Sequence, residues 1–534
     1  MELEKLWPYD IEIFPNVFTI YIGNAETRNC WGFEISERKD ERQEMFSFLR
    51  TIVRQKGYMV GFNCVMFDYP VLHFILKNQD CTVEEIYDYA MTVISADGDD
   101  KFKYILSAKE TMIPQLDLYK IWHFDNKARA TSLKMLEFNM RSRNIEDLPY
   151  EPGSVLTSEQ IDNLLRYNKH DMAETCKFLM ESMGQIEFRE ELSKKYKKDM
   201  LNFNDTKIGK EYFIMKLEES NPGSCYIKTP YGRKIRQTVR DSIDLSECIL
   251  PYIEFQRPEF RAVKEWFCKQ TITETKGVFS DIEEHDLGDV AKYANLRVKK
   301  KKLTDKVDVE QLKKEHPLGW IEEKELKSGA VNKYFMWRVA DNLNVIVDGM
   351  QYDYGVGGLH GAMHNTILES DDKRVIRSFD FASYYPHLSF INRIYPEHFG
   401  EGFCDLYEEM YYERKKHAKG TPENAMMKLA LNGSYGASND KFSPFYDPKF
   451  TMTITISGQL TLTMLAEWLI SVPTVEIVIL NTDGLEFIVD REYNEQAEAV
   501  CAEFEKLTNI ALEGETYKKL CIADVNSYCG EFYD

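Results

Sequence analysis

The chain has 534 residues, which corresponds to two to four domains at ~100–200 residues per domain. Its hydrophobic content of 43% and aromatic content of 13% exclude a disordered or low-complexity protein. The sequence has no apolar run of roughly 18 residues and no basic-then-apolar start, so we expect neither a membrane partner nor a secretion signal. Its 11 cysteines form no Cys-x-x-Cys pair, which argues against a zinc site and indicates free thiols in a cytoplasmic protein.

The formal net charge of −21 does not exclude a nucleic-acid enzyme. Metal sites themselves use carboxylates, and DNA needs only a local basic surface. Basic runs occur at residues 194–198, 299–302 and 414–417, although each alone is more typical of a solvated helix face.

The apolar pattern changes twice along the chain. Residues 1–190 alternate short strands and helices, with strands predicted at 11–22 and 59–62 and a helix at 164–181. Residues 191–345 are mixed in pattern, and a charged stretch at 289–316 predicts a helix.

The pattern from residue 346 onwards begins with Gly355, Gly357 and Gly358, which predict a flexible joint. A strand at 375–379 and helices at 406–419 and from 423 past 431 follow. Apolar runs at 475–480 and 485–489 flank Asp483-Gly484 and predict a hairpin, because Asp-Gly readily adopts the positive φ values of a tight turn.

Four carboxylates in the first region are spaced so that they can converge. Asp10 and Glu12 are two residues apart on a predicted strand and therefore face one side. Asp68 follows the next strand, and Asp171 lies four residues after Tyr167 on a predicted helix face. Carboxylates in one place repel each other unless cations lie among them, and two divalent ions ~3.5–4 Å apart would neutralise them. Oxygen ligands of this kind favour Mg²⁺ or Mn²⁺.

This carboxylate set, with Tyr167, spans residues 7–185 and resembles the DEDD-class 3′→5′ exonuclease of proofreading polymerases, in the form with a tyrosine in its third motif. The resemblance implies an RNase H-like domain in which Tyr167 holds the attacking water. It also implies that Asn63 and Phe67 contact the single-stranded 3′ end of DNA by stacking or phosphate contact. Core packing is an equal alternative for Phe67.

Residues 380–386, Asp-Phe-Ala-Ser-Tyr-Tyr-Pro, follow the strand predicted at 375–379. They resemble the first palm motif of family B DNA polymerases. The resemblance implies that Asp380 binds metal and that the turn at Ser383 receives triphosphate oxygens. It also implies that Tyr385 stacks under the sugar and excludes a 2′-hydroxyl.

The residues Lys428, Asn432, Tyr435 and Gly436 share one face of a predicted helix. They resemble the family's second motif, in which the lysine neutralises charge on the transferring phosphoryl group and the tyrosine and glycine support the nascent base pair. Arg414, one helix earlier, resembles a finger residue that reaches the β- and γ-phosphates. An amphipathic core helix with one exposed lysine is the alternative.

Residues 481–484, Asn-Thr-Asp-Gly, resemble the third palm motif, usually Asp-Thr-Asp-Ser. Asp483 keeps the second metal-binding position, whereas Asn481 adds no charge. Two further matches imply DNA contacts. In the first, Gly357 and Gly358 resemble a linker that touches the template. Residues 455–459 resemble a template- and primer-contacting segment of phage members.

The DNA-binding residues implied by these further matches are Gly357, Gly358, Thr455 and Gln459.

The expected fold class is α/β and α+β multidomain: an exonuclease domain at 1–190, an intervening region at 191–345 and a palm at 346–534. Asp380 and Lys428 lie close in the sequence, so the fingers are expected to be one short helical hairpin at about 400–440. No Lys-Lys-Tyr-like motif follows residues 525–528, so we expect the thumb to be missing or rudimentary, or supplied by another chain.

The resemblance implies a template-directed DNA polymerase with proofreading, using two Mg²⁺ or Mn²⁺ ions per active site. Its partners would be a DNA primer-template, deoxynucleoside triphosphates, and a separate thumb chain or processivity factor. The motifs suggest a bacterial virus and hence the host cytoplasm. Two alternatives stay open: an exonuclease with a degenerate palm that only holds DNA, and a polymerase subunit that is inactive alone.

Overall fold

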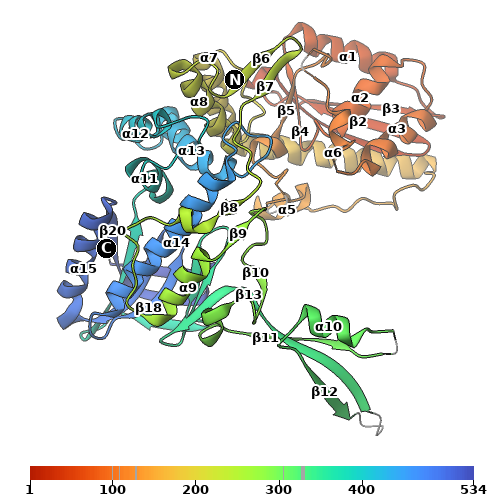
Figure 1. The fold of residues 1–534 in the computed structure, drawn as a ribbon. Helices are drawn as coiled ribbons and strands as arrows, with labels where there is room; N and C mark the ends of the chain where they lie inside the picture. Colours follow the sequence, from red (N-terminus) through yellow and green to blue (C-terminus); the bar gives the residue numbers. More distant parts are fainter. Residues whose placement is uncertain (99, 108, 127–128, 305, 326–330, 534) are drawn as a thin grey trace. The chain divides into compact units, whose positions relative to one another are not determined.

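The computed structural model describes residues 1–534 except 99, 108, 127–128, 305, 326–330 and 534 (Figure 1). The chain divides into two compact units. The first unit comprises Met1–Ile208 and Lys419–Leu429, and the second comprises Gly209–Ala418 and Ala430–Asp534. The expected three-part division stays a prediction.

The first unit contains a mixed five-stranded sheet of order β3-β2-β1-β4-β5. β1 is antiparallel to β2 and parallel to β4. The elements of this unit are η1 (Leu3–Lys5), β1 (Leu6–Phe14), β2 (Val17–Gly23), β3 (Cys30–Ser36), α1 (Arg42–Arg54), β4 (Tyr58–Gly61), α2 (Asp68–Lys77), α3 (Val83–Ser95), η2 (Asp100–Tyr104), β5 (Gln115–Asp117), α4 (Leu118–Ile121), α5 (Leu133–Asn139), α6 (Ser158–Glu181) and α7 (Met183–Tyr196). Two further helices, α8 (Asp205–Ser220) and α13 (Pro422–Ala437), run across the boundary between the units.

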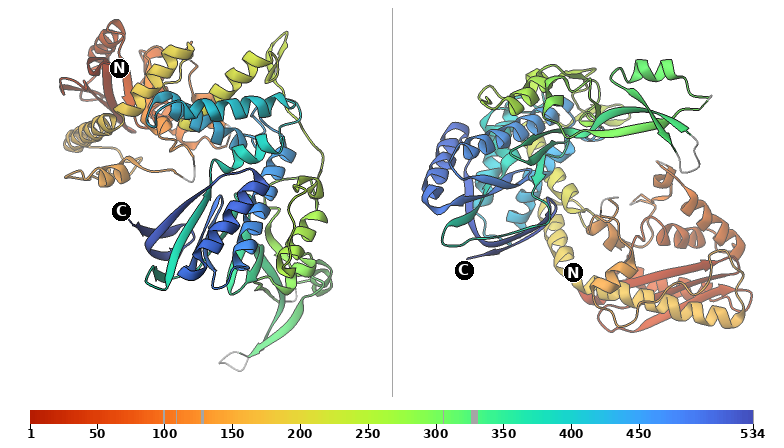
Figure 2. Two further views of the ribbon diagram at one scale, coloured as in Figure 1. Left: turned by 90° about the vertical axis from the view of Figure 1, so that its left-hand side faces the viewer. Right: turned by 90° about the horizontal axis from the view of Figure 1, so that it is seen from below.

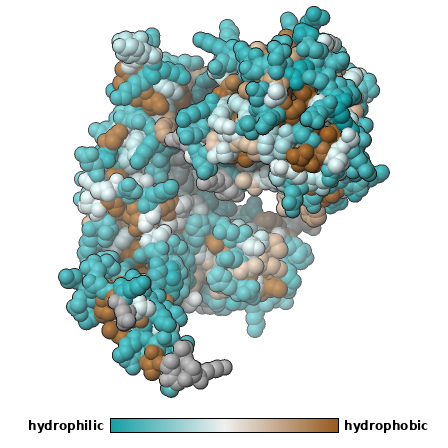
Figure 3. All heavy atoms as spheres, turned by 90° about the vertical axis from the view of Figure 1, so that its right-hand side faces the viewer, coloured by the Kyte–Doolittle hydropathy of each residue, from teal (hydrophilic) through white to brown (hydrophobic). Residues whose placement is uncertain are grey.

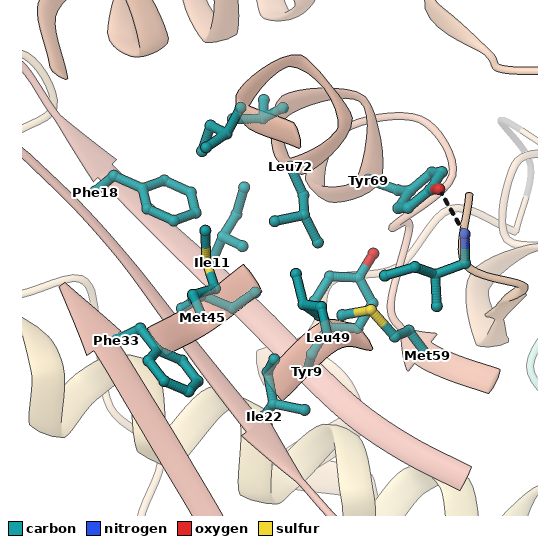
Figure 4. Close-up of a cluster of buried hydrophobic side chains, with 14 of the residues drawn as sticks. Tyr9, Ile11, Phe18, Ile22, Phe33, Met45, Leu49, Met59, Tyr69 and Leu72 are labelled. Atoms are coloured by element: carbon teal, nitrogen blue, oxygen red, sulfur yellow. Dashed lines mark hydrogen bonds between the residues drawn. The ribbon is translucent and has the colours of Figure 1, made fainter. Parts of the chain in front are cut away.

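Alternate residues of β1 divide the first sheet into two faces. Tyr9 and Ile11 point into a buried core with Leu49 of α1 and Leu72 of α2 (Figure 4). α6 lies along the opposite face, where it contacts β1 and β2 (Figure 1). Asp10 and Glu12 have the opposite orientation to Tyr9 and Ile11 and therefore face α6.

The second unit is built around an antiparallel sheet whose central order is β15-β18-β19-β17-β20-β16. α14 packs against β18 and β19, and α15 packs against β20 and α14. The elements of this unit before α14 are β6 (Tyr226–Thr229), β7 (Gly232–Ile235), β8 (Ile243–Asp244), η3 (Leu245–Cys248), α9 (Pro258–Cys268), β9 (Thr271–Ile272), β10 (Ser280–Glu283), η4 (Gly288–Lys292), β11 (Arg297–Lys302), α10 (Val309–Glu315), β12 (Trp320–Glu325), β13 (Val331–Val347), β14 (Met350–Tyr354), β15 (Leu359–Ala362), β16 (Thr366–Glu369), β17 (Arg374–Phe381), α11 (Tyr384–Ile391) and α12 (Gly402–Lys415). The remaining elements are α14 (Pro448–Ile470), β18 (Glu476–Asn481), β19 (Gly484–Asp490), η5 (Arg491–Tyr493), α15 (Asn494–Thr508), β20 (Leu512–Asp524) and β21 (Ser527–Phe532).

Two of the predicted elements are wrong. The strand predicted at 11–22 is two antiparallel strands, because residues 15–16 form a turn between β1 and β2. The helix predicted at 289–316 divides into η4, β11 and α10, because the alternating residues of 297–302 pair with β13. Among the described residues, we find no helix with both the length and the apolar character that crossing a bilayer requires.

Candidate active sites

A cluster of carboxylates lies between the first sheet and α6. One carboxylate oxygen each of Asp10, Glu12 and Asp171 lie within 4.8 Å of one another. Asp68, at the start of α2, also acts electrostatically on Asp10 and Glu12. The structure thus brings the four predicted carboxylates together from a strand, a helix start and a long helix.

α6 positions its residues because it is regular over its whole length. A capping box between Thr157 and Gln160 begins the helix. Tyr167 and Asp171 are four positions apart, which places both side chains on one face, and they are hydrogen-bonded. Burial raises the pKa of Tyr167 well above its usual value, so its hydroxyl stays protonated and can donate a hydrogen bond.

Burial raises the pKa of every carboxyl in this cluster. The pKa of Asp68 rises to about 7 and that of Asp171 to about 6, with loss of solvation as the main cause. The pKa values of Asp10 and Glu12 also rise well above the usual range, because burial is reinforced by the neighbouring carboxylates. Without a cation the cluster would therefore hold protons near neutral pH.

The donor set fits a divalent cation. Asp171 Oδ1 is buried and has no hydrogen-bond partner among the residues that the structure describes. Asn168 Nδ2 donates to Asp10 Oδ2 at 2.7 Å, and Thr19 Oγ1 donates to Asn168 Oδ1 at 3.2 Å. The hydrogen bonds from Thr19 through Asn168 fix the orientation of the Asp10 carboxylate in the cluster. Carboxylate oxygens are ligands suited to Mg²⁺ or Mn²⁺.

Three neighbours of this cluster were not predicted from the sequence. Glu137 and His170 form a second group of ligand atoms with Asp171, all within 4.8 Å. His170 Nε2 lies 3.2 Å from Glu137 Oε2, and Glu137 is fully buried. Lys134 of α5 acts electrostatically on Glu12 and Asp171. His170 could have been found from the sequence because it directly precedes Asp171. No sequence pattern indicated that Lys134 and Glu137 of α5 lie at this cluster.

The two residues expected near the 3′ end of DNA lie on the loop before α2. Asn63 has φ +64°, and its backbone N–H donates to Asp117 Oδ1 at 3.0 Å. Phe67 is partly buried and packs against the core beside α2. Both side chains are partly buried, and their contact with DNA stays a prediction.

The second carboxylate set lies on β17 and the hairpin of β18 and β19. Asp380 pairs in register with Gly484, and the Phe381 N–H donates to the Asp483 carbonyl at 2.8 Å. Both residues are reached by solvent, while the surrounding protein removes part of the solvation of each carboxylate. Burial and the charge of Asp483 raise the pKa of Asp380 to about 6, so the structure brings these two predicted residues together.

The turn of this hairpin differs from the predicted one. Asp-Gly does not supply the positive φ; Thr482 does, at +60°. This conformation is strained for a β-branched residue. The Thr482 N–H donates to Leu359 O at 2.9 Å, and its hydroxyl lies 3.2 Å from His360 Nε2. These contacts from β15 hold the turn that presents Asp483.

Additional carboxylates share the sheet face of Asp380. Glu513 lies opposite Asp380 on β20, and Glu486 and Glu515 lie opposite Ser378. Burial and the charge of Asp380 raise the pKa of Glu486 to about 8. The sequence signal that we missed was the two-residue spacing of Glu513 and Glu515 along β20, which places both on one face.

The residues expected to bind the nucleotide surround the start of α11. Ser383 has φ +49° and precedes this helix. The ring of Tyr385 lies 4.5 Å from that of Tyr435, and its hydroxyl donates to Gly357 O at 3.3 Å. Arg414 lies in the last turn of α12. The phosphate and sugar contacts of these residues remain predictions.

α13 carries the other predicted nucleotide-binding residues. Lys428, Asn432 and Gly436 are exposed at intervals of four residues along it, as one helix face requires. Lys428 belongs to the part of α13 that groups with the first unit, so its role at Asp380 stays a prediction.

The predicted DNA contacts of α14 are buried. Thr455 is fully buried, and its hydroxyl bonds Tyr435 at 2.5 Å. Gln459, 1% exposed, accepts from the Gly355 N–H at 3.0 Å and donates to Gly355 O at 2.9 Å. These side chains therefore have the geometry of positioning residues, which hold Tyr435 and the glycine loop.

The glycine loop lies beside the Thr482 turn. Gly358 has φ +152°, and a Cβ on it would lie 2.8 Å from Thr482 Oγ1. Gly357 has no neighbour within 4 Å of its own Cβ position. The loop is thus compact at Gly358, and a template contact by either glycine stays a prediction.

Metal binding at the first cluster is expected to stabilise the protein more at high pH than at low pH. In the unfolded chain an aspartate titrates near ~3.9. Because burial raises the folded-state pKa of Asp171 to about 6 and that of Asp68 to about 7, folding takes up protons, and stability falls as the pH rises through about 4 to 7. A cation replaces these protons, so the Mn²⁺-induced rise in Tm should be larger at about pH 8 than at about pH 5.5.

Differential scanning fluorimetry with and without Mn²⁺ would measure this difference. Asp171→Asn is the matched variant, since it removes one charge and keeps the shape of the side chain. An equal rise in Tm at both pH values, or an unchanged pattern in Asp171→Asn, would contradict metal binding at this cluster.

Comparison with solved structures gives many matching chains, one of which is a DNA polymerase. No protein-family model matches the sequence, and no curated protein matches it. The chain is similar in shape to the family B DNA polymerase from the hyperthermophilic archaeon Pyrobaculum calidifontis, with 10% identity and a TM-score of 0.45. The match covers 99% of this chain and spans 59% of the length of that polymerase. A similarity of this size carries no functional conclusion, so function is inferred below from the side chains.

Proposed function

We propose that the protein is a template-directed DNA polymerase with a 3′→5′ proofreading exonuclease. The observation that carries this proposal is the presence of two carboxylate sets, one in each unit. Asp10, Glu12 and Asp171 converge in the first unit, and Asp380 and Asp483 converge in the second. The expected DEDD-like and palm-like motifs supply these same residues, which is unlike a chance gathering of surface acids.

In the exonuclease, the residues of the chain hold the reacting groups in place. Asp10, kept in position by Asn168, and Asp171 would bind two Mg²⁺ or Mn²⁺ ions with Glu12 and Asp68. Tyr167 would orient the attacking water through its protonated hydroxyl. Asn63 and Phe67 would contact the frayed 3′ end.

In the polymerase, Asp380 and Asp483 would hold the ions near the primer terminus. The bound ions would activate the 3′-hydroxyl and neutralise charge on the triphosphate. Tyr385, packed on Tyr435, would lie against the sugar and exclude a 2′-hydroxyl.

The remaining proposed nucleotide contacts are on the helices. Ser383 precedes α11, Arg414 and Lys428 would contact phosphates, and Asn432 and Gly436 would line the site with Tyr435.

The second candidate is an exonuclease whose palm only holds DNA. Asn481 favours it, because the third palm motif usually has a carboxylate there, and its loss reduces the charge available to a metal. The glutamates on the same sheet face, Glu513 and Glu515, favour the polymerase because their charges act on Asp380 and add negative charge beside it.

The assay that tests the proposal uses a 5′-labelled primer on a longer template with Mg²⁺. With all four deoxynucleoside triphosphates the primer should lengthen, and without them it should shorten from the 3′ end. Shortening without any lengthening would favour the second candidate, and neither reaction would overturn the proposal.

A further inference from the structure

A three-stranded arm of the second unit has one covered face and one open face. The long strand β13 pairs with β11 on one side and with β12 on the other. Together with α10, these strands project from the rest of the unit (Figures 1 and 2). Residues directly opposite each other on antiparallel strands point to the same face, so the strand register assigns each side chain to one of the two faces of the sheet.

α10 covers the first of these faces. Phe335 is fully buried and Leu312 of α10 is 4% exposed. The rings of His316 and Trp337 stack at 4.2 Å, just after the end of α10. Leu312, Phe335 and Trp337 thus form a small core under one side of the sheet.

The other side of the sheet, which we call the open face, carries aromatic rings and cations. Lys300 lies opposite Met336 and Lys302 lies opposite Tyr334, while Trp320 lies opposite Met336 from the other strand. The side chains of the open face are Val298, Lys300, Lys302, Trp320, Glu322, Lys324, Asn332, Tyr334, Met336 and Arg338.

Two contacts support this assignment independently of the register. The guanidinium of Arg338 lies 5.4 Å from the ring of Trp320, and the ammonium of Lys300 lies 5.5 Å from the ring of Tyr334. Lys300, Lys302 and Arg338 are exposed, and Val298 is 47% exposed. Figure 3 shows the arm as a mostly hydrophilic lobe with small hydrophobic patches.

The lysines on the open face differ from Lys299 and Lys333 of the covered face in their acidic partners. On the covered face, Lys299 pairs with Asp281 at 2.6 Å and Lys333 pairs with Glu323 at 2.6 Å. On the open face, Arg338 pairs with Glu284 at 3.3 Å, whereas no carboxylate of the described part of the chain lies within 4.0 Å of the ammonium of Lys300, Lys302 or Lys324. The open face therefore has an excess of positive charge on a chain whose net charge is −21.

We propose that the open face of the β11–β13–β12 arm binds single-stranded DNA. Its lysines can neutralise phosphates, which supplies affinity for any nucleic-acid backbone. Its rings and guanidinium offer flat surfaces on which unpaired bases stack. Bases within a duplex are already stacked on each other, so the aromatic component favours a single strand.

This inference deepens the proposed function, because a polymerase holds its template as a single strand ahead of synthesis. Its test nevertheless needs no catalysis. A protein that neither extends nor excises could still bind a single strand in the predicted manner, and an active polymerase could lack this binding. The two proposals can therefore fail separately.

The test measures binding of the full-length protein to a fluorescently labelled mixed-sequence oligonucleotide by anisotropy, in EDTA to prevent excision. The double variant Lys300→Gln, Lys302→Gln is expected to bind about tenfold more weakly, and its slope of log K against log salt should be shallower by about 1.4. The matched control is Lys299→Gln, Lys301→Gln, which makes the same charge change on the same strand but on the covered face. We expect the control to bind within about twofold of wild type.

The aromatic component is tested separately with Trp320→Leu, which keeps an apolar side chain. It should weaken binding to the single strand by about tenfold and leave binding to a duplex of the same sequence nearly unchanged. Circular dichroism melting of every variant verifies that the arm variants stay folded.

Three outcomes would overturn the proposal. Equal losses in both lysine pairs would show a general effect of net charge, and no loss in either pair would exclude the open face. A larger loss for duplex DNA or for RNA than for single-stranded DNA would assign the face to that ligand.

Discussion

Replacing Asp380 or Asp483 by alanine is expected to lower the rate of primer extension by at least ~10³-fold while excision stays within about twofold of wild type. The two carboxylates lie side by side on β17 and its neighbouring hairpin, where the charge of Asp483 raises the pKa of Asp380. Removal of either one takes away one of the two proposed metal-binding carboxylates, and the glutamates farther along the sheet do not occupy its position. The excision carboxylates belong to the other unit and keep their geometry.

The reciprocal change is Asp10→Ala, which should abolish excision and leave extension. Asp10 faces α6 and has its own support from Asn168, so its removal disrupts the first cluster alone. Asp241→Ala, an exposed aspartate of the second unit, serves as a matched control and should retain both reactions. Loss of both reactions in either active-site variant would contradict two independent sites.

The local elements that carry the sites could be predicted from the sequence because their signals are short-range. The helix predicted at 164–181 is confirmed within α6, and the hairpin at 475–489 is confirmed as β18 and β19. In α6 the apolar periodicity coincides with the buried face, whereas β18 and β19 are mostly apolar runs that are buried on both faces.

The arm could not be predicted, because its charged residues fit a solvated helix as well as a strand. Residues 297–302 are almost all basic, and only their pairing with β13 makes them a strand. This pairing depends on residues more than thirty positions away, which no local pattern reports.

The surroundings of the sites were missed for the same reason. Glu137 reaches the first cluster from α5, and Glu513 and Glu515 reach Asp380 from β20, across a long stretch of sequence. Motif spacing places the residues that react, whereas the residues that tune their charge come from tertiary packing.

The replacement Gly484→Ala should reduce extension by about 10²-fold without unfolding the protein. A Cβ on Gly484 would overlap Asp380 Oδ1 and would lie 3.1 Å from the carbonyl oxygen of Phe379. The backbone of Phe379 can yield by a few tenths of an ångström, but the carboxylate of Asp380 must rotate away. The metal-binding geometry is therefore lost while the hairpin remains paired.

The matched control is Gly402→Ala, at the start of α12 in the same unit, where a Cβ meets nothing within 4 Å. Extension, excision and Tm measured side by side separate displacement of Asp380 from a loss of stability. A Gly484→Ala protein that melts like the control but no longer extends primers would support the role of Asp380. Full extension by that variant would mean that the carboxylate of Asp380 works from a position other than the one against Gly484, and the polymerase site would have to be drawn around different side chains.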